Sequence, residues 1–419
     1  MRSTLFYVPH EIAGFPLFGV GLLLGCLVLA CLAWIAWRLA TKTPIAELLS
    51  ALPVWCVAAA IIAFVLPSIE QVTGTGEPIG LPIRGYGVMV LLGFLSGIAI
   101  SVYRGRQIGL PDDTVIGLGF LMMLGGVLGA RIFYVVQKWQ EFEGEGLAKL
   151  AEAFKLTEGG LVIYGGVIGG LVAGAFYCYR HRLYVPAVAD LVAPGFLLGL
   201  SFGRVGCLLH GCCFGGICTA DLPRIPFPQG SGPYQMQLLD GSVLGIEFAQ
   251  TRHPPGRVDH VATDSAAAQA GVKAGDWVDG ILLSEMEPTP ERDPALPPPL
   301  MTQIELPGKH LRIASEATPD WSLPLHPTQI YASLNALLLC LLIWHLQPLP
   351  SRDGVAFCIA ILLYALSRFL LEWVRSDEAG QLGTSLTISQ WVSLATACLA
   401  TVGLILLFRS PRKRVFVWR

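Results

Sequence analysis

Nine long apolar segments constrain this chain more than any other feature. Each is long enough, or nearly so, to cross about 30 Å of hydrocarbon as a helix. They lie near 17–38, 50–67, 87–103, 114–137, 160–179, 186–206, 328–346, 354–374 and 388–408. Hydrophobic residues make up 53% of the 419 residues and charged residues only 14%. We therefore predict an all-α polytopic membrane protein with about nine transmembrane helices.

The basic residues between these segments predict how the helices are oriented. If the N-terminus lies outside, all five inside segments are basic, from the one with Arg38 and Lys42 to the tail at 409–419. Because cytoplasmic loops carry the excess of Lys and Arg, we expect an outside N-terminus and a cytoplasmic C-terminus. The first apolar segment lacks a small-residue cleavage site, so we expect it to be a retained span. The net charge of −2 suggests no nucleic-acid partner.

A polar, Pro-rich interruption separates the sixth and seventh predicted spans. Within it, 256–281 has the order strand, short helix, glycine turn and strand, which resembles the core of a PDZ domain. Ile304–Ala314 could supply a later strand, and Pro288–Pro299 has the composition of a flexible loop. The alternative is a small β-rich spacer with no ligand. We expect a small extracytoplasmic α+β PDZ-like insert.

These observations divide the chain into five parts. They are an extra N-terminal pair of transmembrane helices (1–75), a membrane core in two parts (80–217 and 326–408), the insert (219–325, PDZ-like around 235–315) and a basic cytoplasmic tail (409–419).

Arg204 lies where the sixth apolar segment leads into a cysteine-rich stretch. A charge in an apolar span costs several kcal/mol unless it faces a partner or a polar ligand. Gly203 and Gly206 flank it and allow backbone, lipid headgroup or a neighbouring helix to approach closely. Cys207 follows at once. The stretch indicates a membrane-embedded anion site.

Four of the eleven cysteines, Cys207, Cys212, Cys213 and Cys218, are grouped on the predicted outer side. One interpretation is one or two structural disulfides, and we expect at least one oxidised pair. A second is a metal site that includes His210, although the spacing matches no common zinc pattern, so we predict no metal. A third is a set of free thiols that line the site.

The eighth apolar segment carries Tyr364, Arg368 and Glu372 at intervals of four residues, so a helix places them on one face. One alternative is an intrahelical Arg368–Glu372 pair that only stabilises the bundle. Because Arg204 enters from the same outer side, the two arginines could instead hold a phosphate.

Further polar residues lie where lipid is expected: Arg84, Tyr86, Arg131 and Tyr164. Each has an architectural alternative, such as an interfacial anchor for Tyr86, snorkelling for Arg131, or a tyrosine packed inside the bundle for Tyr164. His326-Pro-Thr-Gln-Ile-Tyr331 is interpreted mainly as a helix start.

Taken together, these motifs resemble the prolipoprotein diacylglyceryl transferase family. The similarity covers about 80–215 and 326–408, and each motif occurs in the family's order. The motifs are Arg84-Gly-Tyr-Gly87, Gly129-Ala-Arg131, Gly160-Leu-Val-Ile-Tyr-Gly-Gly166, Gly203-Arg-Val-Gly206 through to Gly215, His326-Pro-Thr-Gln-Ile-Tyr331, and Tyr364, Arg368 and Glu372 with Arg375-Ser-Asp377.

The resemblance implies an enzyme of the outer face of the bacterial inner membrane. It implies transfer of the diacylglyceryl group of phosphatidylglycerol to the lipobox cysteine of prolipoproteins, without a cofactor. Arg204 and Arg368 would hold the phosphate, and Glu372 would orient Arg368. The positions that would bind substrate are Arg84, Tyr86, Arg131, Cys207, Gly215 and Tyr364. Phosphatidylglycerol, lipobox-containing prolipoproteins and membrane lipids would be its partners.

The chain departs from the family's pattern in places. Tyr164 stands where the family usually has the histidine favoured as base, and a tyrosine is a weaker base unless cations stabilise its phenolate. Cys207 and Cys212 replace Asn and Glu, and Ala332 follows Tyr331 instead of Glu. Two other functions stay open. They are a diverged, non-catalytic lipid- or peptide-binding protein that uses the insert, and an outer-face thiol or metal protein.

Overall fold

The computed structural model divides the chain into two compact units, which are described separately. The first consists mainly of Thr4–Arg84, and the second comprises Gly85–Phe154 and Gly160–Arg419. The residues that the structure describes are 4–41, 44–72, 78–142, 146, 149, 153, 160–219, 222–249, 253–285, 300–375, 380–381 and 383–415.

The N-terminal unit is a helix pair with a small sheet at one end. Its elements are β1 (Thr4–Pro9), β2 (Glu11–Ile12), β3 (Phe15–Pro16), α1 (Leu22–Ala40), α2 (Ile45–Ala60), a π-helical turn (Ile61–Val65), α3 (Leu66–Ser68), β4 (Gln71–Val72) and β5 (Pro78–Arg84). The strands β1, β5 and β4 form an antiparallel sheet in that order. Trp34 of α1 packs on Trp55 of α2, with ring centroids 6.0 Å apart. The helices correspond to the first two predicted spans.

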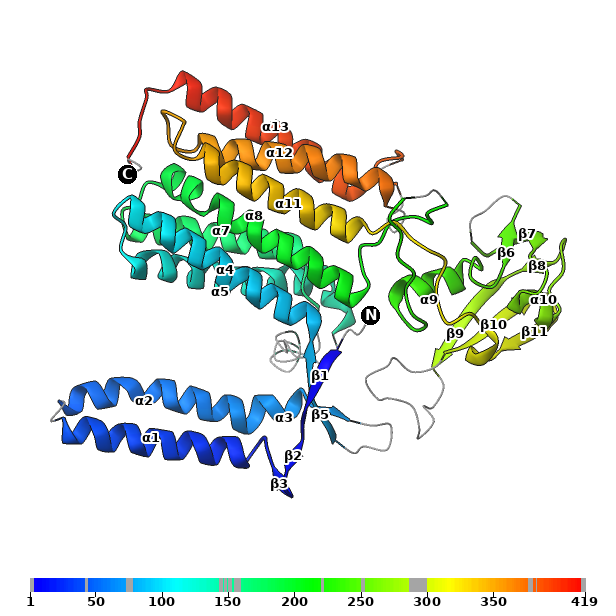
Figure 1. Ribbon diagram of the computed structural model, residues 1–419, viewed down its shortest axis with the longest axis horizontal. Helices are drawn as coiled ribbons and strands as arrows, with labels where there is room; N and C mark the ends of the chain where they lie inside the picture. Colours follow the sequence, from blue (N-terminus) through cyan, green and yellow to red (C-terminus); the bar gives the residue numbers. More distant parts are fainter. Residues whose placement is uncertain are drawn as a thin grey trace. The chain divides into compact units, whose positions relative to one another are not determined.

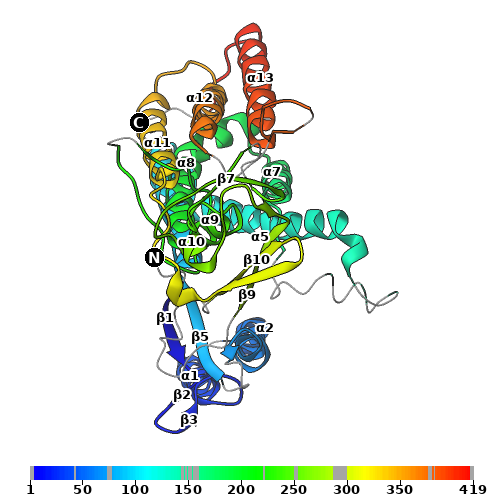
Figure 2. The same ribbon diagram turned by 90° about the vertical axis from the view of Figure 1, so that its right-hand side faces the viewer.

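The second unit contains a bundle of seven long helices, which we call the membrane bundle (Figures 1 and 2). They are α4 (Gly85–Gln107), α5 (Asp112–Gln137), α7 (Ile163–Arg180), α8 (Val185–His210), α11 (Thr328–Leu346), α12 (Val355–Leu371) and α13 (Ile388–Arg409). Within the described residues, eight helices of the whole chain are long and apolar enough to cross a membrane. The chain is therefore a polytopic, mostly helical membrane protein.

Helix α7 corresponds to the fifth predicted span, and it is not among those eight because Arg180, its tyrosines and its glycines reduce its apolar character. It nevertheless runs antiparallel along α5. Gly125 faces Gly169 at one level, and Gly129 faces Gly165 at the next; a Cβ built on Gly129 would lie 2.4 Å from Gly165 O. Glycines at this spacing let the two backbones touch. Helix α7 therefore packs closely along α5, and its 18 residues lie within the length range of a transmembrane helix.

A second glycine-lined crossing joins α4 to α8. A Cβ on Gly97 would lie 2.9 Å from Gly195 O, and one on Gly93 would lie 3.1 Å from Gly199 O. About two turns further along, Gly206 packs against the ring of Tyr86. The crossing therefore brings the start of α4 to the end of α8, where Arg204 lies.

The opposite end of the bundle is fixed by Asp190 of α8. Its carboxylate accepts hydrogen bonds from the N–H groups of Gly354 and Phe357, each 2.7 Å long, at the start of α12. Negative charge is favourable at a helix N-terminus. Gln347, just after α11, donates to the Asp190 carbonyl at 2.5 Å. These bonds fix α8, α11 and α12 relative to one another.

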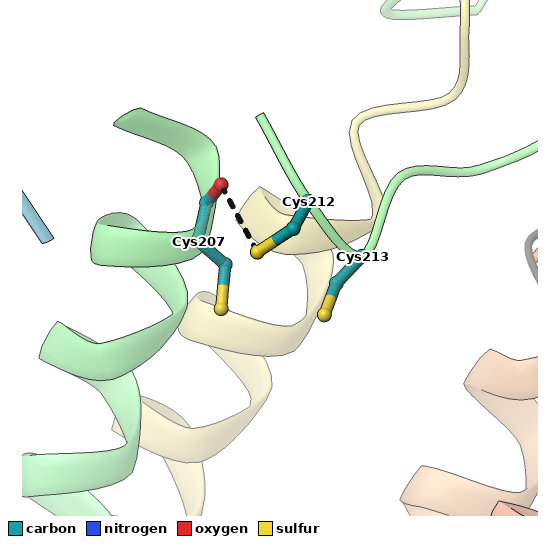
Figure 3. A group of neighbouring side chains, drawn as sticks. All are labelled: Cys207, Cys212 and Cys213. Carbon is teal, nitrogen blue, oxygen red and sulfur yellow. Dashed lines mark hydrogen bonds between the residues drawn. The ribbon is translucent and has the colours of Figure 1, made fainter. Parts of the chain in front are cut away.

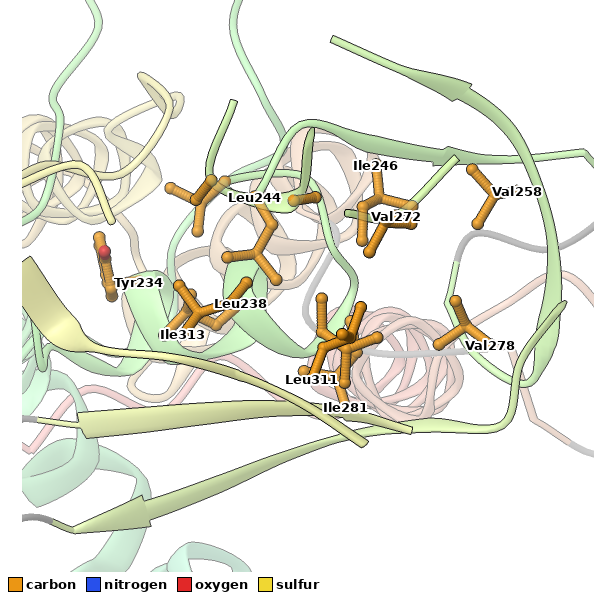
Figure 4. Packing of buried hydrophobic residues seen from close by; sticks show 14 residues of the cluster. Tyr234, Leu238, Leu244, Ile246, Val258, Val272, Val278, Ile281, Leu311 and Ile313 are labelled. Carbon is orange, nitrogen blue, oxygen red and sulfur yellow. The ribbon is translucent and has the colours of Figure 1, made fainter. Parts of the chain in front are cut away.

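The insert between α8 and α11 has its own hydrophobic core (Figure 4). It comprises α9 (Gly232–Leu239), β6 (Ile246–Phe248), β7 (Gly256–Val261), α10 (Ala266–Ala270), β8 (Trp277–Val278), β9 (Gly280–Glu285), β10 (Leu300–Leu306) and β11 (Lys309–Ile313). Two antiparallel sheets have the orders β6-β7-β8 and β11-β10-β9. The predicted strand, capped helix and glycine turn occur in order, with Ser265 capping α10 and Gly271 ending it at φ +92°. The expected Pro288–Pro299 loop lies outside the described residues.

The α5–α7 crossing gives a first prediction. Gly129→Ala places a methyl group against the backbone of α7, so we expect a loss of about 1–3 kcal/mol of stability and a lower thermal unfolding midpoint in detergent. Gly126→Ala is the matched control, because a Cβ at Gly126 meets Gly166 O at an ordinary 3.4 Å. Equal midpoints for the two variants would contradict the crossing.

Candidate functional site

The ends of α8, α11 and α12 are joined by a short extended segment, Gly215–Gly216. Gly215 N–H donates to His326 O at 3.1 Å, and His326 N–H donates to Gly216 O at 3.0 Å. On the other side, Gly216 N–H donates to Val374 O at 3.0 Å. A Cβ on Gly215 would lie 2.6 Å from the Cβ of His326, so only glycine fits. The segment fixes the residues around it at one end of the bundle, which we call the Arg204 end.

The cysteine-rich turn after α8 is held from the first turn of α11. Gly211 ends α8 in the left-handed conformation, and its N–H donates to Cys207 O. Thr328 Oγ1 donates to Cys213 O, and Gln329 Nε2 donates to Cys212 O, both at 2.8 Å. The His326–Tyr331 motif is therefore architectural, as predicted, and what it holds is the backbone of the cysteines.

Glu372 is the carboxylate around which the Arg204 end is arranged. It is only 3% exposed and accepts hydrogen bonds from Arg368 and from Thr387 Oγ1, the latter at 3.1 Å. Arg375 Nη1 lies 3.4 Å from its second oxygen. Arg368 also donates to Ser389 Oγ at 3.2 Å. The predicted Arg368–Glu372 pair is present, and Glu372 additionally binds Arg375 and the N-cap of α13.

Arg204 extends this group toward α8. Its guanidinium interacts with the hydroxyl of Tyr364 and with the sulfurs of Cys213 and Cys207. Cys213 also interacts with Arg375. Electrostatic interactions thus link Arg204 and Arg375 to Cys213, and ion pairs link Arg375 and Arg368 to Glu372. Among the described residues of this set, three guanidiniums accompany one carboxylate, which leaves an excess of positive charge suited to an anion.

Tyr86, at the start of α4, belongs to the same group. It interacts with Arg204 and with the three clustered cysteines, and its ring lies 6.2 Å from that of His210. With Gly215 and Tyr364, it is one of the predicted site residues that the fold brings together at the Arg204 end.

All eleven cysteines are free thiols in the structure, so the expected disulfide is not found. The sulfurs of Cys207, Cys212 and Cys213 instead lie within 4.8 Å of one another (Figure 3). Cys218 is buried and is not part of this cluster. The physical reason is the turn at Gly211, which folds Cys212 and Cys213 back toward Cys207 while the chain carries Cys218 into the base of the insert.

The three sulfurs do not share their protons equally. Hydrogen bonding with the Cys207 and Cys212 thiols lowers the pKa of Cys213, and the charges of Arg204 and Arg375 act in the same direction. Hydrogen bonds with the thiols of Cys207 and Cys213, together with burial, raise the pKa of Cys212. Opposite charges and hydrogen bonds favour a thiolate, so Cys213 is the sulfur at which negative charge is best tolerated.

Three predicted site residues are not brought into this group. Arg131 is 2% exposed and donates to Ala153 O at 2.7 Å and to Gly160 O at 3.1 Å, so it holds the chain beyond α5. Tyr164 lies in the first turn of α7, 38% exposed, and no hydrogen bond of its hydroxyl to another described residue is found. Arg84 is the last residue of β5, in the other unit.

Sequence reasoning named Arg375 only as part of the family motif, without a role, and did not name Thr387. The spacing of three residues from Glu372 to Arg375 is a recognisable signal for a second pair. Thr387 comes from the next helix, and its contact depends on the packing of α12 against α13. Ser376 and Asp377, part of the same motif, lie outside the described residues.

Comparison with known proteins places this arrangement in a family. A sequence profile described as prolipoprotein diacylglyceryl transferase matches residues 77–406. The chain belongs to the prolipoprotein diacylglyceryl transferase family. A relative from Rhodopirellula baltica, named phosphatidylglycerol–prolipoprotein diacylglyceryl transferase, is 35% identical over 98% of this chain and 90% of its own length. The family predicted from the order of the motifs is confirmed.

More distant relatives bear the same name. One from Clostridium tetani is 24% identical over 76% of this chain and 91% of its own length. One from Xanthomonas campestris is 30% identical over 80% of this chain and 89% of its own length. The family profile begins at residue 77, after α1 and α2, whereas the alignment with the Rhodopirellula baltica relative spans nearly the whole chain.

The buried carboxylate gives a second prediction. Glu372→Gln keeps the shape of the side chain but leaves Arg368 and Arg375 without its charge, so we expect about 3–5 kcal/mol of destabilisation. Thermal unfolding of the purified protein in detergent measures this change. Glu305→Gln is the control, because within the described part of the chain the ion pair found for the Glu305 carboxylate is a 3.9 Å contact with the exposed His310. An unchanged midpoint for Glu372→Gln would show that Glu372 is not the carboxylate on which this end depends.

Proposed function

We propose that this protein transfers the diacylglyceryl group of phosphatidylglycerol to the lipobox cysteine thiol of prolipoproteins, the first step of bacterial lipoprotein maturation. The observation that carries the proposal is that Arg368 and Arg375 pair with Glu372 while the charges of Arg204 and Arg375 both act on Cys213, within a chain of this family. An anion held at this place would have its headgroup at the end of the bundle and its acyl chains along the helices.

The chemistry requires that a negative charge be stabilised as it develops. The thiol sulfur attacks the glycerol carbon that carries the phosphate ester, a C–S bond forms, and the C–O bond breaks. The electron pair of the C–O bond leaves on glycerol phosphate, and the thiol proton passes to a base. Guanidiniums that are already in place around the phosphate favour this transition state. We assign that role to Arg204 and Arg368, with Arg375 in support.

The neighbours of these arginines suit the role of positioning residues. Glu372 and Ser389 fix the guanidinium of Arg368 from two sides, and Tyr364 contacts Arg204. Tyr86 and Tyr364 would line the headgroup site. A Cβ built on Gly203 would meet no atom within 4 Å, which supports room for a lipid beside Arg204.

We further propose that the Arg204 end lies at the outer face of the bacterial inner membrane. The insert leaves the bundle at this end, between α8 and α11. The opposite end carries Arg104 and Arg106 of α4 and Arg180 of α7, and basic residues favour the cytoplasmic side. With α7 as a span, this gives nine spans, an outside N-terminus and a cytoplasmic C-terminus.

We propose a PDZ-like fold for the insert. The order of β7, the capped helix α10, the glycine turn and the following strands supports it. Whether the insert takes a peptide is a separate question, which binding of prolipoprotein segments to the full-length protein would answer.

The activity is tested by complementation of a bacterium depleted of its own transferase. We expect the chain to restore growth and to yield diacylglyceryl-modified lipoproteins, as detected by mass spectrometry. A stably inserted protein that leaves prolipoproteins unmodified would favour a non-catalytic binding protein instead.

The arginines give a third prediction. Arg204→Ala and Arg368→Ala should each abolish transfer to a lipobox peptide while the protein still inserts, because each removes a positive charge from the phosphate site. Arg368→Lys should also be impaired, since a point charge cannot replace the planar fork that Glu372 and Ser389 hold. Arg180→Ala, an exposed arginine at the opposite end, is the matched control. Wild-type transfer by the Arg204 or Arg368 variants would remove this assignment.

Tyr164 gives a fourth prediction, which rests on its place in the family motif. Its exposure leaves the hydroxyl accessible to an incoming thiol. We expect Tyr164→Phe to lose at least about tenfold in transfer, because general-base assistance is worth on the order of 100-fold or more. Tyr164→His should retain activity. If Tyr164→Phe matches the wild type across about pH 6 to 9, in which thiols and imidazoles titrate, the catalytic role of Tyr164 is wrong.

A further inference from the structure

The cluster of Cys207, Cys212 and Cys213 has the geometry of a three-ligand metal site. The three sulfurs form a triangle within 4.8 Å of one another (Figure 3). Zn–S bonds of about 2.3 Å in tetrahedral geometry place thiolate sulfurs about 3.8 Å apart. The sulfurs would have to approach one another by at most about 1 Å to bind such an ion.

The backbone that carries these thiols is held in an unusual conformation. Cys213 adopts φ +58°, which few residues other than glycine adopt. Its carbonyl and that of Cys212 accept hydrogen bonds from the buried Thr328 and Gln329. Backbone strain of this kind persists only when its surroundings hold it, and here the result is that the thiols converge.

The charges around the cluster suit bound thiolates. A divalent ion with three thiolates carries a net charge of −1, and the positive charges of Arg204 and Arg375 act on Cys213. Binding would release the three thiol protons to solvent. Thiolates select thiophilic ions such as Zn²⁺ and Cu⁺ over Mg²⁺ and Ca²⁺.

Three ligands leave one tetrahedral position open. No other His, Cys, Asp or Glu side chain of the described residues reaches the cluster. Sites with three protein ligands and an open position are typical of catalytic zinc, whereas structural sites are closed by four. Cys207 and Cys213 belong to the group that contains Arg204, to which the lipid phosphate is assigned.

We propose that Cys207, Cys212 and Cys213 bind a thiophilic metal ion, Zn²⁺ in the first instance, whose open position takes the thiol of the substrate cysteine. The identity of the bound thiol rests on the proposed function, whereas the metal site itself does not. The proposed metal site differs from the expectation of no metal. That expectation was based on the sequence spacing of a ligand set that included Cys218 and His210.

The ion would assist the base that accepts the thiol proton. A thiol that coordinates a metal is deprotonated outright, and its proton would pass through Tyr164 to solvent. The metal-bound sulfur then attacks the glycerol carbon, the C–S bond forms, and glycerol phosphate leaves with the electron pair of the C–O bond. The product is a neutral thioether, a weaker ligand than a thiolate, so it can dissociate. A chain with Tyr164 in place of the family's histidine would gain most from such activation.

The test begins with the metal content of the full-length protein, purified in detergent without chelators. We expect about one Zn²⁺ per chain, as for a single tetrahedral site, and at least about tenfold less in Cys207→Ser and Cys213→Ser. Cys218→Ser, which removes a cysteine outside the cluster, should keep its metal. Size-exclusion chromatography before the analysis restricts the comparison to folded protein.

The second measurement replaces Zn²⁺ by Co²⁺ and follows the thiolate-to-cobalt absorption bands. A lipobox peptide should change these bands, and the same peptide with serine in place of its cysteine should not. A protein without metal, or with a disulfide within the cluster, would overturn the proposal. If Co²⁺ binds but its absorption bands do not change when the cysteine peptide is added, the proposal that the open position takes the substrate thiol is wrong. Each result is independent of the transfer assay, so failure of the metal site and failure of the proposed function are distinguishable.

Discussion

The ion pairs of Glu372 are the interactions on which the Arg204 end depends. One buried carboxylate binds Arg368 and Arg375 and accepts a hydrogen bond from Thr387. Without this carboxylate, two guanidiniums would lie near the hydrophobic part of the bundle with less negative charge to balance them. Such unbalanced buried charge destabilises the folded state. The same residue joins the end of α12 to the start of α13, and through Arg375 it reaches the Gly215–Gly216 segment. The carboxylate of Glu372 therefore serves both the packing of the helices and the proposed anion site.

The helix crossings determine where that charge can act. Two antiparallel pairs, α4 with α8 and α5 with α7, approach through glycines whose Cβ atoms would collide with the facing backbone. In lipid, close packing of small residues replaces much of the hydrophobic drive that water supplies. The α4–α8 crossing brings Tyr86 beside Arg204 and the cysteines, although more than a hundred residues separate them in the sequence. The site is thus a consequence of how the small residues are spaced.

Local patterns in the sequence predicted much of this. The spans follow from runs of apolar residues, and the Arg368–Glu372 pair follows from a spacing of four on one helix. What the sequence could not predict depends on contacts between distant segments. Thr387 reaches Glu372 from another helix. Arg131 is directed to the carbonyls of Ala153 and Gly160, and Cys218 separates from the other three cysteines because the chain turns at Gly211. The role of Tyr164 remains a prediction, since its partner would be a substrate.

The central claim is that the arginines at this end support transfer of a diacylglyceryl group from an anionic phospholipid to a thiol. The most direct measurement uses the purified full-length protein in vesicles of phosphatidylglycerol with a lipobox peptide. Mass spectrometry of the peptide is combined with an assay of released glycerol phosphate. We predict a diacylglyceryl group on the cysteine and an equal amount of glycerol phosphate, with neither product in vesicles of phosphatidylcholine alone. An unmodified peptide and no released glycerol phosphate, from protein that is folded and inserted, would contradict it.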